Sequence, residues 1–380
     1  MGEPPVARPA RFFASFQLLV KVCGLDLGNS ILDWKSAKER GTKCQAIFFS
    51  ITTATIVVIL IMEVISIIQQ ESKTFTLPWF LLNVKLGLAI HGAASAIYMA
   101  IITCQGAFVQ LEQRYAALPT PAPPNTQKKA IGLAFMFIFT ICLMLVIVAL
   151  AADDTSKWVK AGSPVSFDNL WGADPFVRII SGIFSTLSTI IFMLAFGATA
   201  GQLRFFNKEL RGVLDEDCNY DRIVLMSEKQ RELLSLSRFV YRTFGRLANV
   251  AALGAFIAHV DAMAINVGFR SFLTRGEIAE MIGLLIMTGV LLGILLQTPA
   301  TVNELIQESA DHVLHSAIWL NKDARLFPIA TNMIERARAP EHKMQCLRFL
   351  RLNTETAHAV MFSLLFFGNI LAILAALFAK

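Results

Sequence analysis

The sequence predicts an all-α, polytopic membrane protein, and three observations support this class. Hydrophobic residues make up 55% of the 380 residues and charged residues only 16%, whereas a soluble domain is roughly 25% charged. The mean hydropathy is +0.57. The charges are concentrated between long apolar blocks, which match the roughly 20 residues that a helix needs to cross about 30 Å of hydrocarbon.

Seven apolar segments are long enough to span a membrane. In order they are 46–68, 78–102, 130–152, 179–200, 248–269, 279–297 and 357–379. The third and fourth contain no charged residue, and Pro299 follows the end of the sixth, which is the shortest. The first 45 residues lack the compact apolar block and cleavage site of a signal peptide. We therefore expect seven transmembrane helices.

The distribution of lysine and arginine predicts the orientation of these helices. One side, which includes the N-terminus, carries 26 of the 34 lysines and arginines, and the other side carries 7. Because basic residues concentrate in cytoplasmic loops, the N-terminus is expected in the cytosol and the C-terminus outside. No cysteine falls in an expected outer loop, where oxidation favours disulfides. The net charge of +6 is assigned to inner-face residues near anionic lipid, and no basic-aromatic patch indicates nucleic-acid binding.

The loops divide the chain into four expected parts. A cytosolic N-terminal segment (1–45) precedes a six-helix bundle (46–300), which carries an outer lid loop (153–178) and a cytosolic helical loop (201–247). Cytosolic anchor helices (301–356) lead to the seventh helix (357–380). Apolar residues recur at helical spacing in the cytosolic stretches. These stretches either pack together as an extension of the bundle or lie flat on the inner membrane surface.

Three ionisable residues are expected inside the membrane at a common depth. Counting at about 1.5 Å per residue places Glu63, Lys85 and Asp261 roughly 8–12 Å below the outer surface. Glu63 and Lys85 form a natural pair, which leaves Asp261 to a ligand, water, His91 or His259. The pair could be a purely structural bridge or could snorkel outward, and His259 could be an ordinary core histidine. Because intramembrane charges often mark functional sites, we interpret these five residues as lining a ligand pocket that opens to the outside.

No catalytic arrangement is visible in the sequence. The six histidines are scattered, the cysteines lack the CxxC spacing, and no glycine-rich phosphate loop follows a strand. An intramembrane enzyme would need a compact cluster of metal ligands or a nucleophile with its base. We expect a protein that is not an enzyme and that has no cofactor and no metal site.

The C-terminal part of the chain resembles the invertebrate gustatory receptor family, relatives of insect odorant receptors. The resemblance rests on Glu308 and Ser309 ("ES") after the proline-ended sixth helix, and on the amphipathic helix around them. It also rests on "CLRFLRLNTETAHAVMFSLLFFGNILAIL", which leads directly into the last helix. The family signature TYhhhhhQF is absent, and Ser363 and Asn369 occupy the positions of its Tyr and Gln. The chain therefore resembles a divergent or gustatory-receptor-like member.

The resemblance implies a ligand-gated, non-selective cation channel in the plasma membrane of sensory neurons. It implies a homotetramer, or a heteromer with related subunits, arranged around the seventh helices, and a small-molecule tastant that binds from outside. Ser363, Gly368 and Asn369 form a polar stripe on the apolar seventh helix, which suits a pore lining. An interhelical hydrogen bond is the alternative role for Asn369.

A G-protein-coupled receptor is the alternative function, because it shares the helix count. It requires an outer N-terminus, which the charge distribution opposes, and the sequence lacks a DRY after the third helix and an NPxxY in the seventh. A transporter is a third alternative, supported only by the intramembrane charges.

Overall fold

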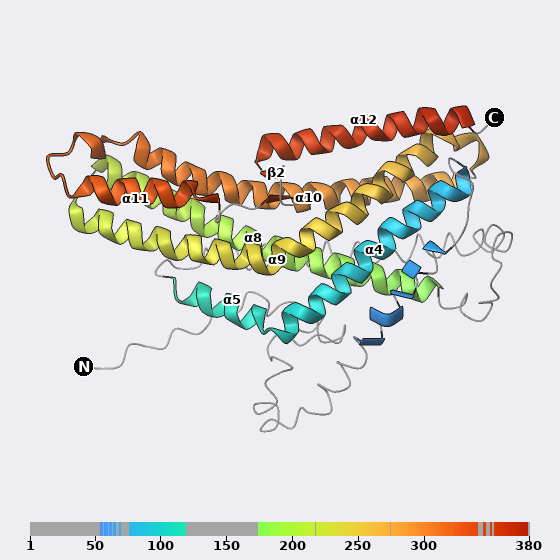
Figure 1. Ribbon diagram of the computed structural model, residues 1–380, viewed down its shortest axis with the longest axis horizontal. Helices are drawn as coiled ribbons and strands as arrows, with labels where there is room; N and C mark the ends of the chain where they lie inside the picture. Colours follow the sequence, from blue (N-terminus) through green and yellow to red (C-terminus); the bar gives the residue numbers. More distant parts are fainter. Residues whose placement is uncertain are drawn as a thin grey trace, which may run out of the picture.

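The computed structural model describes residues 76–118, 174–216, 218–273, 275–340 and 353–378, together with parts of 54–69 and 345–351. Nearly all of these residues are helical (Figure 1). The α-helices are α4 (Leu77–Cys104), α5 (Ala107–Ala116), α8 (Asp174–Glu216), α9 (Tyr220–Gly268), α10 (Arg275–Leu314), α11 (Leu326–Arg338) and α12 (Thr354–Phe378). The 3-10 turns η2 (Arg270–Phe272) and η3 (Ala317–Leu320) lie between them, and β1 (Gln345–Cys346) pairs antiparallel with β2 (Leu350–Arg351). The all-α class is confirmed.

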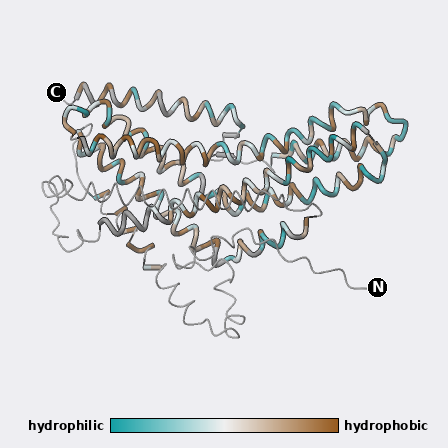
Figure 2. The backbone as a smooth tube through the Cα atoms, turned by 180° about the vertical axis from the view of Figure 1, so that it is seen from behind, coloured by the Kyte–Doolittle hydropathy of each residue, from teal (hydrophilic) through white to brown (hydrophobic). Residues whose placement is uncertain are grey.

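Three of the helices are much longer than a membrane is thick. The helices α8, α9 and α10 hold 43, 49 and 40 residues, which corresponds to about 60–74 Å against about 30 Å of hydrocarbon. Hydrophilic residues gather toward the end of the molecule that holds α11 (Figures 1 and 2). Each long helix therefore contributes to a membrane bundle at one end and to an extension at the other. We call this extension, residues 203–244 and 302–338, the anchor.

Four described stretches are long and apolar enough to cross a membrane. The stretches are Leu77–Ile102, Phe184–Asp215, Asn249–Gly268 and Gly276–Leu320, and they correspond to the second, fourth, fifth and sixth expected helices. Residues 130–152, most of 46–68 and residues 153–173 of the expected lid lie outside the described residues. The count of seven spans and the orientation of the termini stay predictions.

The helix α4 crosses α9 at a contact between backbones. A Cβ placed on Gly87 would lie 2.6 Å from the carbonyl oxygen of Gly254, and one placed on Gly254 would lie 2.6 Å from the carbonyl oxygen of Gly87. Small residues allow helices in a membrane to approach this closely. The neighbouring Ala255 and Ala258 are buried as well. These contacts set the register in which α4 runs antiparallel to α9.

The apolar stripes of the anchor face one another within a single chain. Residues at helical spacing on three different helices are completely buried, among them Phe206, Leu210, Val240, Ile306 and Val313. They belong to one continuous core that also includes residues of α11. The stretches that the sequence places in the cytosol thus pack together in the structure, which is the first of the two arrangements that the sequence allows.

The helix α10 does not end where the sequence suggests. The sequence places a helix end between Gln297 and Pro299, yet α10 runs through this proline to Leu314. A proline inside a helix leaves the carbonyl four residues earlier without its amide donor. Here Pro299 is buried, and α8 and α9 pack along α10. This packing stabilises the continuous helix despite the lost hydrogen bond.

The C-terminal helix α12 packs against α9 and α10 (Figure 1). Its start is capped reciprocally: Asn353 Oδ1 accepts a bond from the Thr356 amide at 2.7 Å, and Thr356 Oγ1 accepts one from the Asn353 amide at 2.9 Å. The Glu304 carboxylate of α10 accepts a further bond from the Thr354 amide at 2.7 Å. A second link joins Gln297 to His358 at 3.1 Å. These contacts tie the entry of α12 to the middle of α10.

Candidate functional site

A buried polar layer joins α4 to α8 inside the membrane bundle. His91 is only 2% exposed, and its Nε2 lies 2.7 Å from Ser185 Oγ. One turn along, Ser188 donates a hydrogen bond to Ser95 at 3.0 Å. His91 Nδ1 is buried without a hydrogen-bond partner among the described residues. A ring nitrogen in this state is able to bind a polar group of a ligand or a water molecule.

A second polar contact joins α9 to α10. His259 Nδ1 lies 2.9 Å from Thr288 Oγ1, and the Thr288 hydroxyl donates to the Leu284 carbonyl at 2.8 Å. Because the threonine proton is already used, Thr288 accepts and His259 Nδ1 donates. The neutral ring then carries its lone pair on Nε2. Gly289 lies beside this contact, and a Cβ there would be 3.4 Å from the imidazole ring, an ordinary van der Waals distance.

Asp261 is buried in the span of α9 and is 6% exposed. No hydrogen-bond or ion-pair partner of its carboxylate is found among the described residues. Where α4 and α9 cross, Gly87 lies beside Ala258 and His91 lies beside Gly254. Because the two helices are antiparallel, this register brings half-buried Lys85 to about the depth of Asp261. Glu63 lies outside the described residues. A buried carboxylate without a partner is costly, which makes Asp261 a candidate for contact with a bound molecule.

The expected pocket residues do not form one cluster. His91 faces α8 and His259 faces α10, so the two histidines line separate helix interfaces. No group of three or more His, Cys, Asp or Glu residues suited to a metal ion occurs among the described residues. The polar groups of the bundle are therefore distributed over several interfaces at related depths.

The polar residues of α12 lie on different faces. Gly368 is buried, and a Cβ added there would collide with the side chain of Met263 on α9. Asn369 and Ser363 are exposed in the single chain, and the Ser363 hydroxyl donates to the Ala359 carbonyl at 2.8 Å. Asn369 shares its face with large exposed apolar residues, of which Phe366 is 59% exposed. Gly368 thus packs within the subunit, whereas Asn369 faces outward from it.

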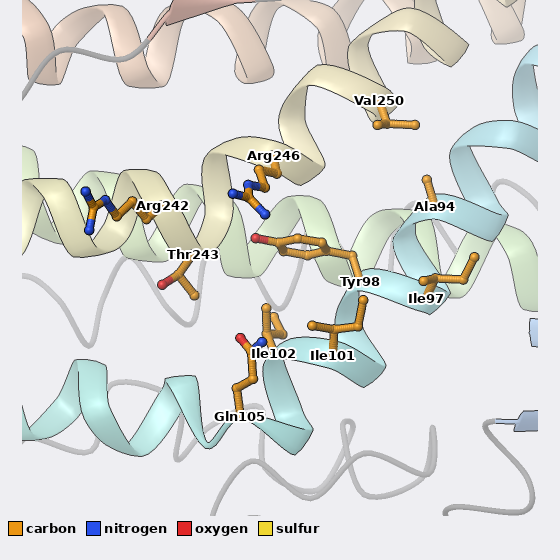
Figure 3. Close-up of a pocket in the computed structure, with 10 residues that line it drawn as sticks. All are labelled: Ala94, Ile97, Tyr98, Ile101, Ile102, Gln105, Arg242, Thr243, Arg246 and Val250. Atoms are coloured by element: carbon orange, nitrogen blue, oxygen red, sulfur yellow. The ribbon is translucent and has the colours of Figure 1, made fainter. Parts of the chain in front are cut away.

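The sequence reasoning missed a groove between α4 and α9, close to the anchor. It has a volume of about 520 Å³. Tyr98 and Ile101 of α4 and Gln105, just after the end of α4, lie on one side, and Arg242 and Arg246 of α9 lie on the other (Figure 3). None of the expected pocket residues lines it. The available signal was the spacing of four residues between the two arginines, immediately before the apolar segment that begins at 248.

The two residues "ES" link the long helices inside the anchor. Asn207 of α8 donates to the Leu305 carbonyl at 2.9 Å and to the Glu308 carboxylate at 3.0 Å. Gln230 of α9 donates to Ser309 Oγ at 3.2 Å and to the Met333 carbonyl of α11 at 3.2 Å. Neighbouring side chains of α10 thus bind α8 and α9 at once. Their role in the described structure is to hold the anchor together.

Two solved structures of the insect olfactory receptor OR5 from Machilis hrabei are similar to this fold. One, in complex with eugenol, has a TM-score of 0.65 and 11% sequence identity and covers 98% of this chain and 100% of that chain. The other has a TM-score of 0.64 and 12% identity and covers 95% and 97%. The chain therefore has an insect-olfactory-receptor-like fold, and its apolar helices identify it as a membrane protein.

At the level of sequence, the chain matches one family model and no curated protein. The family model matches residues 12–368, and its description assigns no gustatory role. Because this match covers most of the sequence, the chain belongs to the family described as Caenorhabditis protein of unknown function, DUF267.

Proposed function

We propose that the chain is a subunit of a chemosensory, ligand-gated channel that admits cations when a small molecule binds from outside. The observation that supports this most directly is the likeness in fold to an olfactory receptor over 98% of the chain. That receptor was solved with eugenol, a small molecule. We further propose a gustatory role in the plasma membrane of a sensory neuron, in agreement with the sequence resemblance around Glu308 and Ser309.

The proposed ligand contacts lie in the outer half of the bundle and involve Asp261, Lys85, His91, His259 and Glu63 of the first span. Because His91 and His259 line separate helix interfaces, a ligand in this proposal contacts more than one interface. Two features favour these residues: the unpartnered carboxylate of Asp261 and the unpartnered Nδ1 of His91. A ligand that binds there opens the channel only if it binds the open state more tightly than the closed state. A difference of about 1–3 kcal/mol, which is typical of coupled sites, is sufficient for a clear response.

The proposed ion path runs along α12 at the centre of a tetramer, formed by copies of this chain or by related subunits. Asn369 supplies an amide dipole on the exposed face of α12, and Ser363 lies on its flank. Gly368 packs on Met263, so in this proposal it positions α12 against α9. The exposed apolar residues of the same face then contact neighbouring subunits or lipid.

Patch recording from cells that express the full chain, screened with a panel of small molecules, tests the proposal. An activating molecule should produce a current whose half-maximal concentration shifts in Asp261→Asn while the reversal potential is unchanged. Asn369→Leu should change conductance or permeability ratios and leave ligand sensitivity nearly intact. Asn332→Leu, an exposed residue of the anchor, is the matched control and should change neither.

The opposite result in the two variants would exchange the pocket role of Asp261 and the pore role of Asn369. If Asp261→Asn changed the reversal potential and Asn369→Leu changed only ligand sensitivity, the pocket and pore residues would be wrongly placed. A ligand response that requires a G protein and carries no current through this chain would contradict the channel itself and favour the alternative receptor class.

A further inference from the structure

The groove between α4 and α9 changes character along its length. At one end it is apolar, with Ile97, Ile101 and Val250 exposed by 36%, 45% and 44%. At the other end it is polar and basic, with Arg242 and Arg246 one turn apart on the same face of α9. A molecule that fills this groove must therefore have an apolar part and an anionic part.

The change from apolar to basic coincides with the ends of two candidate spans. The span on α4 ends at Ile102, and Gln105 lies one turn beyond it; the span on α9 begins at Asn249, and Arg246 lies one turn before it. At about 1.5 Å per residue, the two polar side chains lie roughly 5 Å outside the apolar stretches. This is the depth of lipid headgroups, where arginine is favourable.

The two arginines leave positive charge uncompensated in the groove. No ion pair of Arg242 or Arg246 is found among the described residues. Like charges four residues apart on a helix repel each other, so an anion between them would be stabilised. Figure 3 shows Arg246 next to the hydroxyl of Tyr98, with Gln105 across the groove. These side chains offer several donors in addition to the two guanidinium groups.

We propose that this groove binds an anionic phospholipid, with its phosphate between Arg242 and Arg246 and an acyl chain along Ile97, Ile101 and Val250. Guanidinium groups bind phosphate oxygens in a bidentate manner, and basic pockets between membrane helices bind anionic headgroups. A volume of about 520 Å³ accommodates a headgroup and part of one chain. The lipid bridges α4 and α9 at the boundary between bundle and anchor. Its assignment to the inner leaflet follows from the predicted orientation, and the site does not depend on channel activity.

Lipid binding to the purified full-length protein in neutral detergent tests the proposal. Fluorescent phosphatidylserine is titrated into the protein, with phosphatidylcholine and inorganic phosphate as competitors. Arg242→Gln and Arg246→Gln should each weaken phosphatidylserine binding about fivefold, the factor that corresponds to one basic residue near an anionic surface. The matched control is Arg231→Gln, an exposed arginine of α9 in the anchor, which should leave the affinity unchanged.

The competitors distinguish the occupants. Phosphatidylcholine should displace the probe at least tenfold less effectively than unlabelled phosphatidylserine, and inorganic phosphate should not displace it at matched concentration. Equal displacement by phosphatidylcholine would show an unselective lipid surface, and displacement by phosphate would show a free anion site; either outcome overturns the proposal. Size-exclusion profiles verify that the variants are folded, and an equal loss in Arg231→Gln would also overturn it.

Discussion

Gly87 and Gly254 lie where an added Cβ would overlap with the backbone of the neighbouring helix. Each faces the carbonyl oxygen of the other at a distance that excludes a Cβ. The obstacle is backbone, which cannot rotate away as the end of a side chain can. Gly368 differs, because its neighbour is the flexible side chain of Met263, so a small substitution there is accommodated more easily.

Gly254→Ala should therefore lower the free energy of unfolding, although alanine favours helix formation. The overlap should cost about 1–3 kcal/mol, as overpacking does in cores, against a gain of about 0.5–1 kcal/mol from the better helix former. Thermal unfolding in detergent measures the difference. Gly293→Ala in α10, where nothing lies within 4 Å of an added Cβ, is the matched control and should be neutral or stabilising. Equal effects of the two substitutions would contradict the close backbone contact between Gly87 and Gly254.

The sequence predicts the depth of a residue better than the direction in which it points. The rise per residue predicts a common depth for Lys85 and Asp261, and the register of α4 against α9 agrees with that. Direction depends on which helices are neighbours, which one sequence does not reveal. The sequence predicts one pocket that includes His91 and His259, yet in the structure they face α8 and α10 respectively. The basic groove was missed for the same reason, because its two walls are more than 130 residues apart in sequence.

At the scale of single elements, the position of α12 depends on a few polar contacts at its start. Its main contacts among the described elements are to α9 and α10, and several of its large apolar residues are exposed. The cap at Asn353 and the Glu304 carboxylate satisfy three of the amide groups at this end or next to it. Capping therefore contributes to the position of the helix as well as to its stability.

Asn353→Ala should destabilise the first turn of α12 by about 0.5–2 kcal/mol, the usual effect of removing a capping side chain. Hydrogen exchange followed by mass spectrometry should show faster exchange at residues 354–357, with α8 and α10 unchanged. Asn353→Asp keeps the acceptor and should retain most of the protection. Unaltered exchange in the alanine variant would show that packing alone determines where α12 begins.

Apolar segments were easier to predict than the ends of helices. The expected segments 78–102 and 357–379 agree with α4 and α12 to within three residues. Changes in composition predict segment boundaries at 200, 248 and 297, but α8, α9 and α10 continue through these points. Hydropathy detects where a helix leaves the hydrocarbon, whereas the helix ends only where its backbone is no longer supported. At Pro299 the tertiary packing provides that support.

For the whole molecule, the predicted orientation is a cytosolic N-terminus and an outer C-terminus. Epitope tags at the two ends of the full chain, stained in intact and permeabilised cells, test it. The C-terminal tag should be stained in intact cells, and the N-terminal tag only after permeabilisation. The opposite pattern would reverse the membrane topology and would place the basic groove in the outer leaflet. It would also favour the G-protein-coupled receptor alternative.

The continuity of α8, α9 and α10 restricts how the length of this chain can change. Since an α-helix turns by about 100° per residue, inserting one residue into one of these helices rotates its anchor portion relative to its membrane portion. Buried residues such as Leu210 or Val240 would then point away from their neighbours. An insertion of seven residues restores the angle closely but displaces the helix by about 10 Å relative to the other two. Tolerated insertions and deletions should therefore be found in the connections at 218–219 and 315–325, and the three helices should change length only together.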